Sequence, residues 1–324
     1  MSQFLYDYTA DAIGSAAADL MAGNLVAFPT ETVYGLGADA SNEDAVARIY
    51  QVKGRPSDHP LIVHIASMER MGDWATNAPE YAFALARDFW PGPMTLVLKR
   101  SNLARDFVTG GQDTIGIRVP NHFAALSLLE AFERIGGKGI AAPSANRYGH
   151  VSPTDALSVV EELGASFGKN DKVLDGGVCG IGIESTIIDC TQNSPSILRP
   201  GPITSHMIEE STGHKVLTSN SRVAKIRVSG SSKSHYSPVA KVYLDQIPQE
   251  GQGFIALARI STPEGVIRLA SPSNDSEFAH ILYASLRKAD LDGLKEVVIH
   301  QPNGEGIGLA ICDRIARASH RDTL

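Results

Sequence analysis

The sequence has few cysteines, no long apolar run and no excess of positive charge. Its three cysteines, Cys179, Cys190 and Cys312, are an odd and widely spaced set that forms neither a disulfide framework nor a C-x-x-C metal site. Free thiols are typical of a reducing compartment, so we expect a cytoplasmic protein. Without a stretch of about 18 apolar residues, the sequence predicts no transmembrane helix and no membrane partner. The first residues also lack the basic start and apolar core of a signal peptide.

The charge balance and two missing motifs narrow the function further. The formal net charge is -7, so the chain as a whole does not predict strong non-specific binding to nucleic acid. The 29 lysines and arginines still allow a local basic patch. The sequence contains no G-x-x-x-x-G-K-[ST] phosphate loop and no H-E-x-x-H zinc motif. If the protein binds ATP, it uses another geometry.

Short apolar runs and helical periods alternate along the chain. Hydrophobic residues make up 43% and charged residues 20%, values that are ordinary for globular domains. The alternation predicts an α/β fold, with a twisted mixed sheet and flanking helices in residues 1–210. A smaller Rossmann-like α/β domain is predicted for residues 239–324. Residues 211–238, rich in Ser, Thr, Lys and Gly, are predicted to be a linker.

The segment Pro29-Thr-Glu-Thr-Val-Tyr-Gly-Leu-Gly37 follows a predicted buried strand, residues 25–28. Hydroxyls, a carboxylate and two glycines leave the sheet together there, where open α/β sheets bind ligands. An ordinary turn, in which threonine side chains satisfy the backbone, explains these residues equally well. From this segment alone, both interpretations stay open.

Two cations, Lys53 and Arg55, flank a glycine at the predicted end of a helix. This pair suits a polyphosphate, because arginine offers a bidentate fork and lysine a point charge. Cations at this place also complement the helix dipole without any ligand. His64 lies inside the apolar run that follows, which is more typical of a satisfied core histidine than of a ligand.

Arg118 interrupts a predicted apolar strand. A charge in such a place is buried only when it has a partner, and either a substrate carboxylate or a structural Asp or Glu would serve. Ser144 and Asn146 are predicted to cap a helix or to line a pocket. Thr154 is predicted to cap the helix that follows it.

A fourth polar cluster surrounds Ser185 and Thr186, whose hydroxyls either bind a substrate or pair with each other. Arg199, just before Pro-Gly, is expected to be exposed, as a ligand contact or as a solvated charge. Together the four clusters offer many hydroxyls, four cations and few carboxylates. That mixture suits a multiply charged anion bound together with a small zwitterion.

Several motifs occur in one order: PTETVYGLG, K-x-R followed by PLIVH, WPGPMT, APSAN followed by SPT, ESTIID and RPGP. In this combination the chain resembles the threonylcarbamoyl-AMP synthase family in its two-domain form, over residues 11–210 and more weakly beyond. The resemblance implies a nucleotidyltransferase. In the implied reaction, L-threonine and bicarbonate form a carbamate, which attacks the α-phosphate of ATP, and pyrophosphate leaves. The resemblance also implies that the product feeds the threonylcarbamoyladenosine modification of tRNA, which a separate transferase completes.

The resemblance also implies which residues bind each substrate. Lys53 and Arg55 are implied to be catalytic, neutralising phosphate charge together with Mg²⁺ that accompanies ATP. The implied threonine site consists of Thr32, His64, Arg118 and Ser185, with Arg118 on the carboxylate. The implied ATP site consists of Arg55, His59, Thr114, Ser144, Asn146, Ser152, Arg199 and Tyr236. One departure is His59, because the family often has asparagine at that position.

Two other functions compete with this interpretation. One is a module that binds double-stranded RNA or tRNA without catalysis, since domains of this type are associated with a concave basic surface. The net charge of -7 argues against it as the main function. The other is a carbamoyltransferase maturation module that uses carbamoyl phosphate. Such proteins carry zinc-finger segments, and three cysteines are too few for them.

Overall fold

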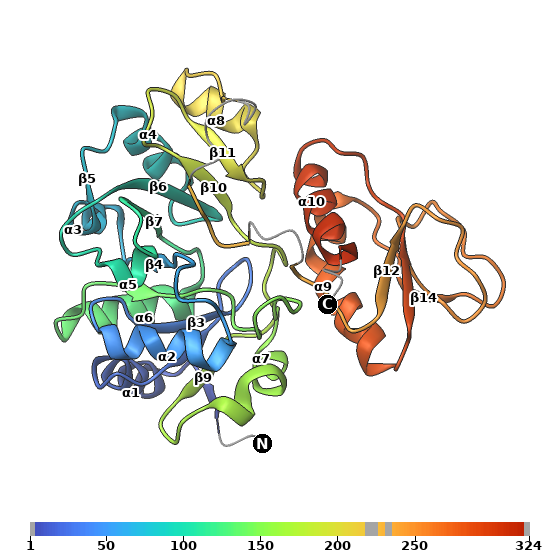
Figure 1. Ribbon diagram of the computed structural model, residues 1–324, viewed down its shortest axis with the longest axis horizontal. Coiled ribbons are helices and arrows are strands. Elements are labelled where there is room, and N and C mark those ends of the chain that lie inside the picture. Colours follow the sequence, from blue (N-terminus) through green and yellow to red (C-terminus); the bar gives the residue numbers. More distant parts are fainter. Residues whose placement is uncertain (1–3, 218–225, 231–234, 321–324) are drawn as a thin grey trace.

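The computed structural model describes residues 4–217, 226–230 and 235–320. These residues form two α/β bodies, which Figure 1 shows side by side. The first body carries a large mixed sheet and the second a small parallel sheet, so the α/β fold predicted from the sequence is confirmed. Within the predicted linker, positions 218–225 and 231–234 lie outside the described residues.

The first body is built on a sheet in which the strands follow the order β1-β9-β2-β3-β8-β4-β7-β6-β10-β11, and β5 pairs with β6. The sheet contains both parallel pairs, such as β4–β7 and β6–β10, and antiparallel pairs, such as β6–β7. The strand bounds are β1 (Leu5–Asp7), β2 (Val26–Phe28), β3 (Gly35–Asp39), β4 (Ile62–His64), β5 (Ala75–Thr76), β6 (Met94–Arg100), β7 (Thr114–Arg118), β8 (Ile140–Ala141), β9 (Lys172–Asp175), β10 (Thr186–Asp189) and β11 (Ser196–Arg199).

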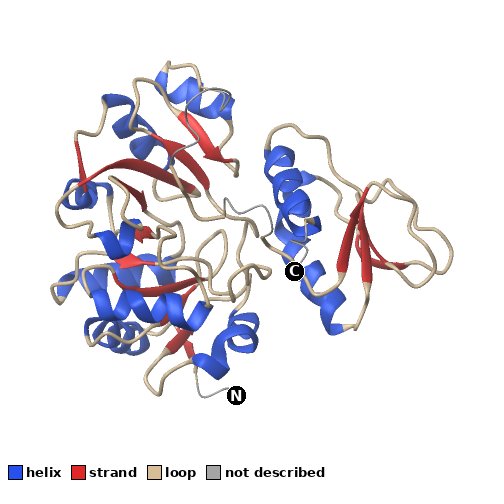
Figure 2. Cartoon of the chain, in the orientation of Figure 1, coloured by secondary structure: helices blue, strands red, loops and turns tan. Residues whose placement is uncertain are grey.

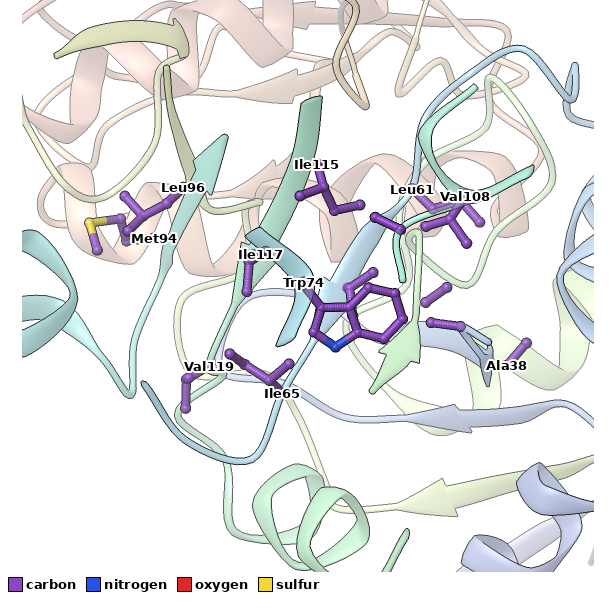
Figure 3. Close-up of a cluster of buried hydrophobic side chains, with 14 of the residues drawn as sticks. Ala38, Leu61, Ile65, Trp74, Met94, Leu96, Val108, Ile115, Ile117 and Val119 are labelled. Atoms are coloured by element: carbon purple, nitrogen blue, oxygen red, sulfur yellow. The ribbon is translucent and has the colours of Figure 1, made fainter. Parts of the chain in front are cut away.

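Helices pack against this sheet and complete its hydrophobic cores. They are α1 (Ala10–Met21), α2 (Glu43–Lys53), α3 (Met71–Trp74), α4 (Glu80–Phe89), α5 (Asp106–Thr109), α6 (Phe123–Arg134), α7 (Ala156–Leu163) and α8 (Ser205–Thr212), with 3₁₀ turns at Met68–Arg70 and Gly164–Ser166. The largest hydrophobic cluster contains the fully buried Trp74, which Figure 3 shows among aliphatic side chains of β7 and of the residues that flank β4. Burying that much apolar surface is the dominant favourable contribution to folding.

The second body has a four-stranded parallel sheet in the order β12-β15-β13-β14. Its strands are β12 (Lys241–Leu244), β13 (Gly253–Ile255), β14 (Ile267–Ala270) and β15 (Glu296–Ile299), and its helices are α9 (Asp275–Leu291) and α10 (Ile307–Ser319). Both helices lie on the side of the sheet that faces the first body (Figures 1 and 2). The smaller Rossmann-like domain predicted for this part of the chain is thereby confirmed.

One local prediction is wrong. The N-cap of α7 is Asp155, whose Oδ1 accepts the backbone N–H of Ser158 at 2.8 Å. Asp155 has the extended backbone that an N-cap requires, with φ -144° and ψ 163°. Thr154, one residue before the N-cap, is buried, and its backbone carbonyl accepts the N–H of Cys179.

Among the described helices, none is long and apolar enough to cross a membrane.

Candidate active site

Strand alternation separates the core of the first body from a polar face. Side chains at odd positions of β7, such as Ile115 and Ile117, point into the cluster shown in Figure 3. The neighbours at even positions therefore point to the opposite face of the sheet. His64 and Arg118 lie on that face at paired positions of the parallel strands β4 and β7. The periodicity that buries the core also places these two side chains together.

A cavity lies over this polar face. Eight of the predicted site residues line it: Thr32, Arg55, His64, Arg118, Ser144, Ser185, Arg199 and Tyr236. The cavity holds only about 50 Å³, whereas pockets for small molecules usually hold about 300–1,000 Å³. It is small because Ser229, Gly230, His235 and Tyr236, which follow the first body in the chain, form part of its lining.

The loop after β2 forms a turn and also contributes to the cavity. Thr30 satisfies the turn, because its hydroxyl donates to the carbonyl of Val33 at 2.7 Å and accepts the N–H of Thr32. Thr32 points its hydroxyl at Arg118, which donates to it through Nη1 at 3.0 Å. Thr30 therefore fits the interpretation of an ordinary turn. The interpretation of Thr32 as a ligand contact stays a prediction.

Arg118 has a carboxylate partner that the sequence did not identify. Its Nη2 lies 2.7 Å from Oε2 of Glu31, and its Nε donates to the carbonyl of Gly92 at 3.2 Å. The guanidinium is 5% exposed and the carboxylate 11%, so each charge is compensated where water is scarce. Arg118 is therefore held rigidly, with part of its charge directed into the cavity.

The surroundings of His64 favour its neutral form. Burial, and then the positive charge of Arg118, lowers the pKa of His64 to about 3. Its ring meets Phe28 edge to face, with 5.9 Å between the centroids, while Nδ1 has no hydrogen-bond partner. A buried polar atom without a partner is uncommon in folded proteins. Nδ1 of His64 is therefore a buried nitrogen whose hydrogen-bond partner the described fold does not supply.

The two cations at the end of α2 differ in position. Arg55 lines the cavity and donates to the carbonyl of Pro60 at 3.0 Å and to the hydroxyl of Ser229 at 3.2 Å. Lys53 is buried behind the cavity wall, where its ammonium donates to the carbonyls of Ser144, at 2.6 Å, and of Asn146. Burial, and then the nearby Arg55, lowers the pKa of Lys53 well below its ordinary value. Lys53 therefore holds the 144–146 loop, and Arg55 faces the ligand space.

Arg199 is buried, so the expectation that it is exposed is wrong. Its Nε and Nη2 both donate to the carbonyl of Ser185, at 3.1 and 2.9 Å, and its Nη1 donates to the carbonyl of Ser229. The antiparallel pairing of β10 and β11 brings Arg199 beside Ser185, a contact that the Pro-Gly sequence does not predict. The hydroxyl of Ser185 also bonds to that of Thr95 at 2.8 Å.

Four other predicted residues lie outside the main cavity. Asn146 donates to the carbonyls of Arg147 and His150 and so closes a turn. His59 packs its ring against Tyr148. Thr114 lies on the polar face but lines a neighbouring cavity, which shares Ile62 and Ser229 with the main one.

The remaining predicted residue, Ser152, acts through a second carboxylate that the sequence did not identify. Its hydroxyl donates to Oε1 of Glu184 at 2.6 Å, and Glu184 lines the cavity. Burial alone would raise the pKa of Glu184, but the charges of Arg314 and Arg199 lower it to about 2. Its position before Ser185 was the only sequence signal available.

The cavity lining does not contain a metal site. Within residues 4–217, 226–230 and 235–320, no three His, Cys, Asp or Glu side chains gather closely enough to bind a metal ion. Glu184 already accepts three hydrogen bonds. Mg²⁺ prefers oxygen ligands and is often held mainly by substrate phosphates. The residues present therefore fit a metal that arrives with a nucleotide and not one bound by the protein alone.

The fold and the site together define a two-domain α/β protein with a small buried cavity, which is lined by three arginines and several hydroxyls. One family model, described as "Telomere recombination", matches residues 18–201. A second, described as "Threonylcarbamoyl-AMP synthase, C-terminal domain", matches residues 203–320. The chain belongs to the threonylcarbamoyl-AMP synthase family.

Relatives with this name cover nearly the whole chain. The protein of Pyrococcus abyssi is 41% identical in an alignment of 323 positions that covers 94% of this chain and 93% of that protein. The protein of Bacillus subtilis is 38% identical, over 95% of this chain and 92% of its own length. A crystal structure of P. abyssi Sua5 in complex with L-threonine superposes with a TM-score of 0.86 at 37% identity, covering 98% of this chain and 96% of the other. These similarities support an enzyme of this family.

Proposed function

We propose that the protein synthesises L-threonylcarbamoyl-AMP from L-threonine, bicarbonate and ATP and releases pyrophosphate. The observation that carries this proposal is the single cavity where Arg118, Arg55 and Arg199 converge with hydroxyls and a neutral histidine. Three guanidinium groups are more than one amino acid needs, and they match a carboxylate together with a polyphosphate. The threonine-bound relative supports the amino acid part of the proposal.

Threonine is assigned to the side of the cavity formed by Thr32, His64, Arg118 and Ser185. In this assignment, Arg118 pairs with the substrate carboxylate and shares its charge with Glu31. The unpartnered Nδ1 of His64 supplies one further polar contact. A neutral imidazole suits this place, because a second cation would repel the substrate ammonium.

ATP is assigned to the other side, formed by Arg55, His59, Thr114, Ser144, Asn146, Ser152, Arg199 and Tyr236. The carbamate oxygen forms a new bond to the α-phosphorus while the bond from that phosphorus to the pyrophosphate oxygen breaks. Arg55 neutralises charge that develops on the phosphates, and Mg²⁺ enters as part of the MgATP substrate. Lys53 contributes its charge from behind the wall, where it also fixes the 144–146 loop.

The product is proposed to serve the threonylcarbamoyladenosine modification of tRNA. Since a separate transferase would act on the tRNA, the proposal does not require tRNA to bind this chain. The three free cysteines, two of them buried, fit the reducing cytoplasm in which we place the protein.

The decisive experiment incubates the full chain with MgATP, bicarbonate and L-threonine and measures pyrophosphate release. We expect release only when both threonine and bicarbonate are present, with threonylcarbamoyl-AMP identified by mass. Release that ignores either compound would contradict the proposal. A salt-dependent gel shift with tRNA, in the absence of any pyrophosphate release, would favour the RNA-binding module instead.

A further inference from the structure

Glu184 is the only carboxylate among the described residues that line the cavity. It is 6% exposed and faces a space that we assign to phosphates, which a free carboxylate would repel. Two of its three hydrogen-bond donors come from the C-terminal domain. The charge of the cavity therefore depends on residues outside the catalytic body.

Arg314, on α10, is the main partner of Glu184. Its side chain is fully buried, and its Nε donates to Oε2 of Glu184 at 2.8 Å. Its Nη2 donates to the carbonyl of Pro200 at 2.9 Å, directly after Arg199 in the chain. Arg314 also lies over the ring of Tyr236, 5.4 Å from the centroid. One guanidinium thus contacts three separate segments of the cavity wall.

Tyr283, on α9, supports the same carboxylate. Its hydroxyl donates to Oε2 of Glu184 at 2.9 Å, and its ring stacks on Tyr236 with 5.6 Å between the centroids. The backbone of α9 also lies close to the loop that carries Glu184. A Cβ added to Gly182 would lie 2.5 Å from the carbonyl oxygen of His280. The loop before β10 therefore rests directly on the C-terminal domain.

We propose that Arg314 is a positioning residue for the nucleotide side of the cavity, acting through Glu184 and the turn after Arg199. It cancels the charge of Glu184 and holds the carboxylate where Ser152 can bond to it. It also fixes the turn that aims Arg199. This proposal rests on the function proposed above, because it concerns the binding of ATP at that same site.

Lysine cannot replace Arg314. The guanidinium uses Nε for Glu184, Nη2 for Pro200 and Nη1 for Asp313, at 2.8, 2.9 and 2.6 Å. A single ammonium group cannot reach three acceptors in this planar arrangement.

Thr32 and Arg118 on the threonine side should be little affected, because Arg118 has no partner in the C-terminal domain among the contacts of the described residues. Ser185, which follows Glu184 and accepts from Arg199, is the threonine-side residue nearest to the change.

The test compares equilibrium binding of MgATP and of L-threonine to the full chain, wild type and Arg314→Met. Methionine keeps much of the apolar volume but leaves Glu184 without its counter-charge. We expect the dissociation constant for MgATP to rise about tenfold or more, and that for threonine to change less than about twofold. Tyr283→Phe, which removes one hydroxyl and keeps the ring, should shift MgATP binding in the same direction by a smaller factor.

A second variant, in which the charge of Glu184 is also removed, distinguishes a positioning role of Arg314 from a general loss of structure. In the double variant Glu184→Gln, Arg314→Met the repelling carboxylate is gone, so MgATP should bind more tightly than to Arg314→Met alone. The matched control is Arg268→Met, because Arg268 is an arginine whose backbone acceptors, Ala256, Leu257, Ile260 and Ala270, all lie in the C-terminal domain. We expect that variant to lower the stability of the C-terminal domain and to change the affinities for MgATP and for threonine by similar factors, if at all.

The proposal is overturned if Arg314→Met weakens both ligands equally, weakens neither, or is not improved by Glu184→Gln. These outcomes differ from failure of the proposed function. If the proposed function is wrong, the wild-type chain itself releases no pyrophosphate in response to threonine and bicarbonate.

Discussion

The two sides of the cavity are built differently. On the threonine side, Arg118 is held by Glu31, Thr32 and Gly92, all within the first body. On the nucleotide side, Arg55 and Arg199 both reach Ser229, which follows the first body in the chain. Glu184, on the same side, is held from α9 and α10. One side belongs to a single core, and the other is assembled from three parts of the chain.

This difference indicates how each side should respond to damage. A side chain held by its own core keeps its geometry as long as that core is folded. A side that needs two bodies to dock loses its geometry when the docking loosens, even if both bodies stay folded. Changes at the domain contact should therefore act on ATP before they act on threonine.

The largest effect is expected from Arg55→Ala. Arg55 supplies the charge nearest to the assigned phosphates, so its loss should lower kcat/KM for ATP about 1,000-fold. Threonine binding, measured directly, should remain within about twofold of the wild type. If threonine binding fell as far as ATP use, the division of the cavity into two sides would be wrong.

Arg118→Ala is the corresponding test of the threonine side. We expect its effect on threonine affinity to be somewhat smaller than the effect of Arg55→Ala on kcat/KM for ATP. Losing a charge-assisted pair with the substrate carboxylate costs about 1.5–3 kcal/mol, so threonine affinity should fall roughly 10- to 150-fold. Binding of MgATP should change little, as judged by calorimetry on the same protein. A variant that bound MgATP poorly and threonine normally would reverse the assignment.

Gly182→Ala tests the domain contact itself. Gly182 has φ +85°, and an added Cβ would press on the carbonyls of Ala279 and His280 in α9. We expect MgATP affinity to fall about tenfold while threonine affinity is kept. Gly180→Ala is the control, because a Cβ at Gly180 meets nothing within 4 Å. Equal effects at both glycines would remove the link between docking and ATP.

The smallest effect concerns pH. Burial is the first cause that lowers the pKa of both His64 and His235, in each case to about 3. Below the ordinary value of 6.5 the unfolded chain takes up protons that the folded chain does not. Their contribution to stability is therefore complete above pH 6.5 and is lost as the pH falls towards 3.

Each histidine should cost about 1 kcal/mol when the pH falls from 6.5 to 5.5. Urea midpoints at the two pH values measure the loss. His64→Asn should remove the loss of stability that comes from His64, on the threonine side. The loss that comes from His235 should persist only while the C-terminal domain is docked against the nucleotide side. A pH dependence that His64→Asn leaves unchanged would show that His64 does not contribute.

Several site residues could be predicted from the sequence, and the misses have physical causes. The K-x-R pattern and the charge inside a strand singled out Arg55 and Arg118, and the family resemblance added His64. All three line one cavity. Arg199 was predicted to be exposed because only its Pro-Gly neighbours were visible, whereas β-pairing buries it. β14 was not predicted, because its side chains are exposed or half-buried and so have no strong apolar period.

By itself, the sequence determined the α/β alternation, the two-domain organisation of the fold and the membership of a family, because these follow from local periodicity and from motifs read in order. Only the tertiary structure decided which buried charges pair. Glu31 and Arg118 lie 87 positions apart in the chain, and Arg314 lies 130 from Glu184. The partner of a buried charge is chosen by what the folded backbone brings within about 3 Å. No local pattern encodes that choice, so the dependence of the nucleotide side on the C-terminal domain appears only once the chain is folded.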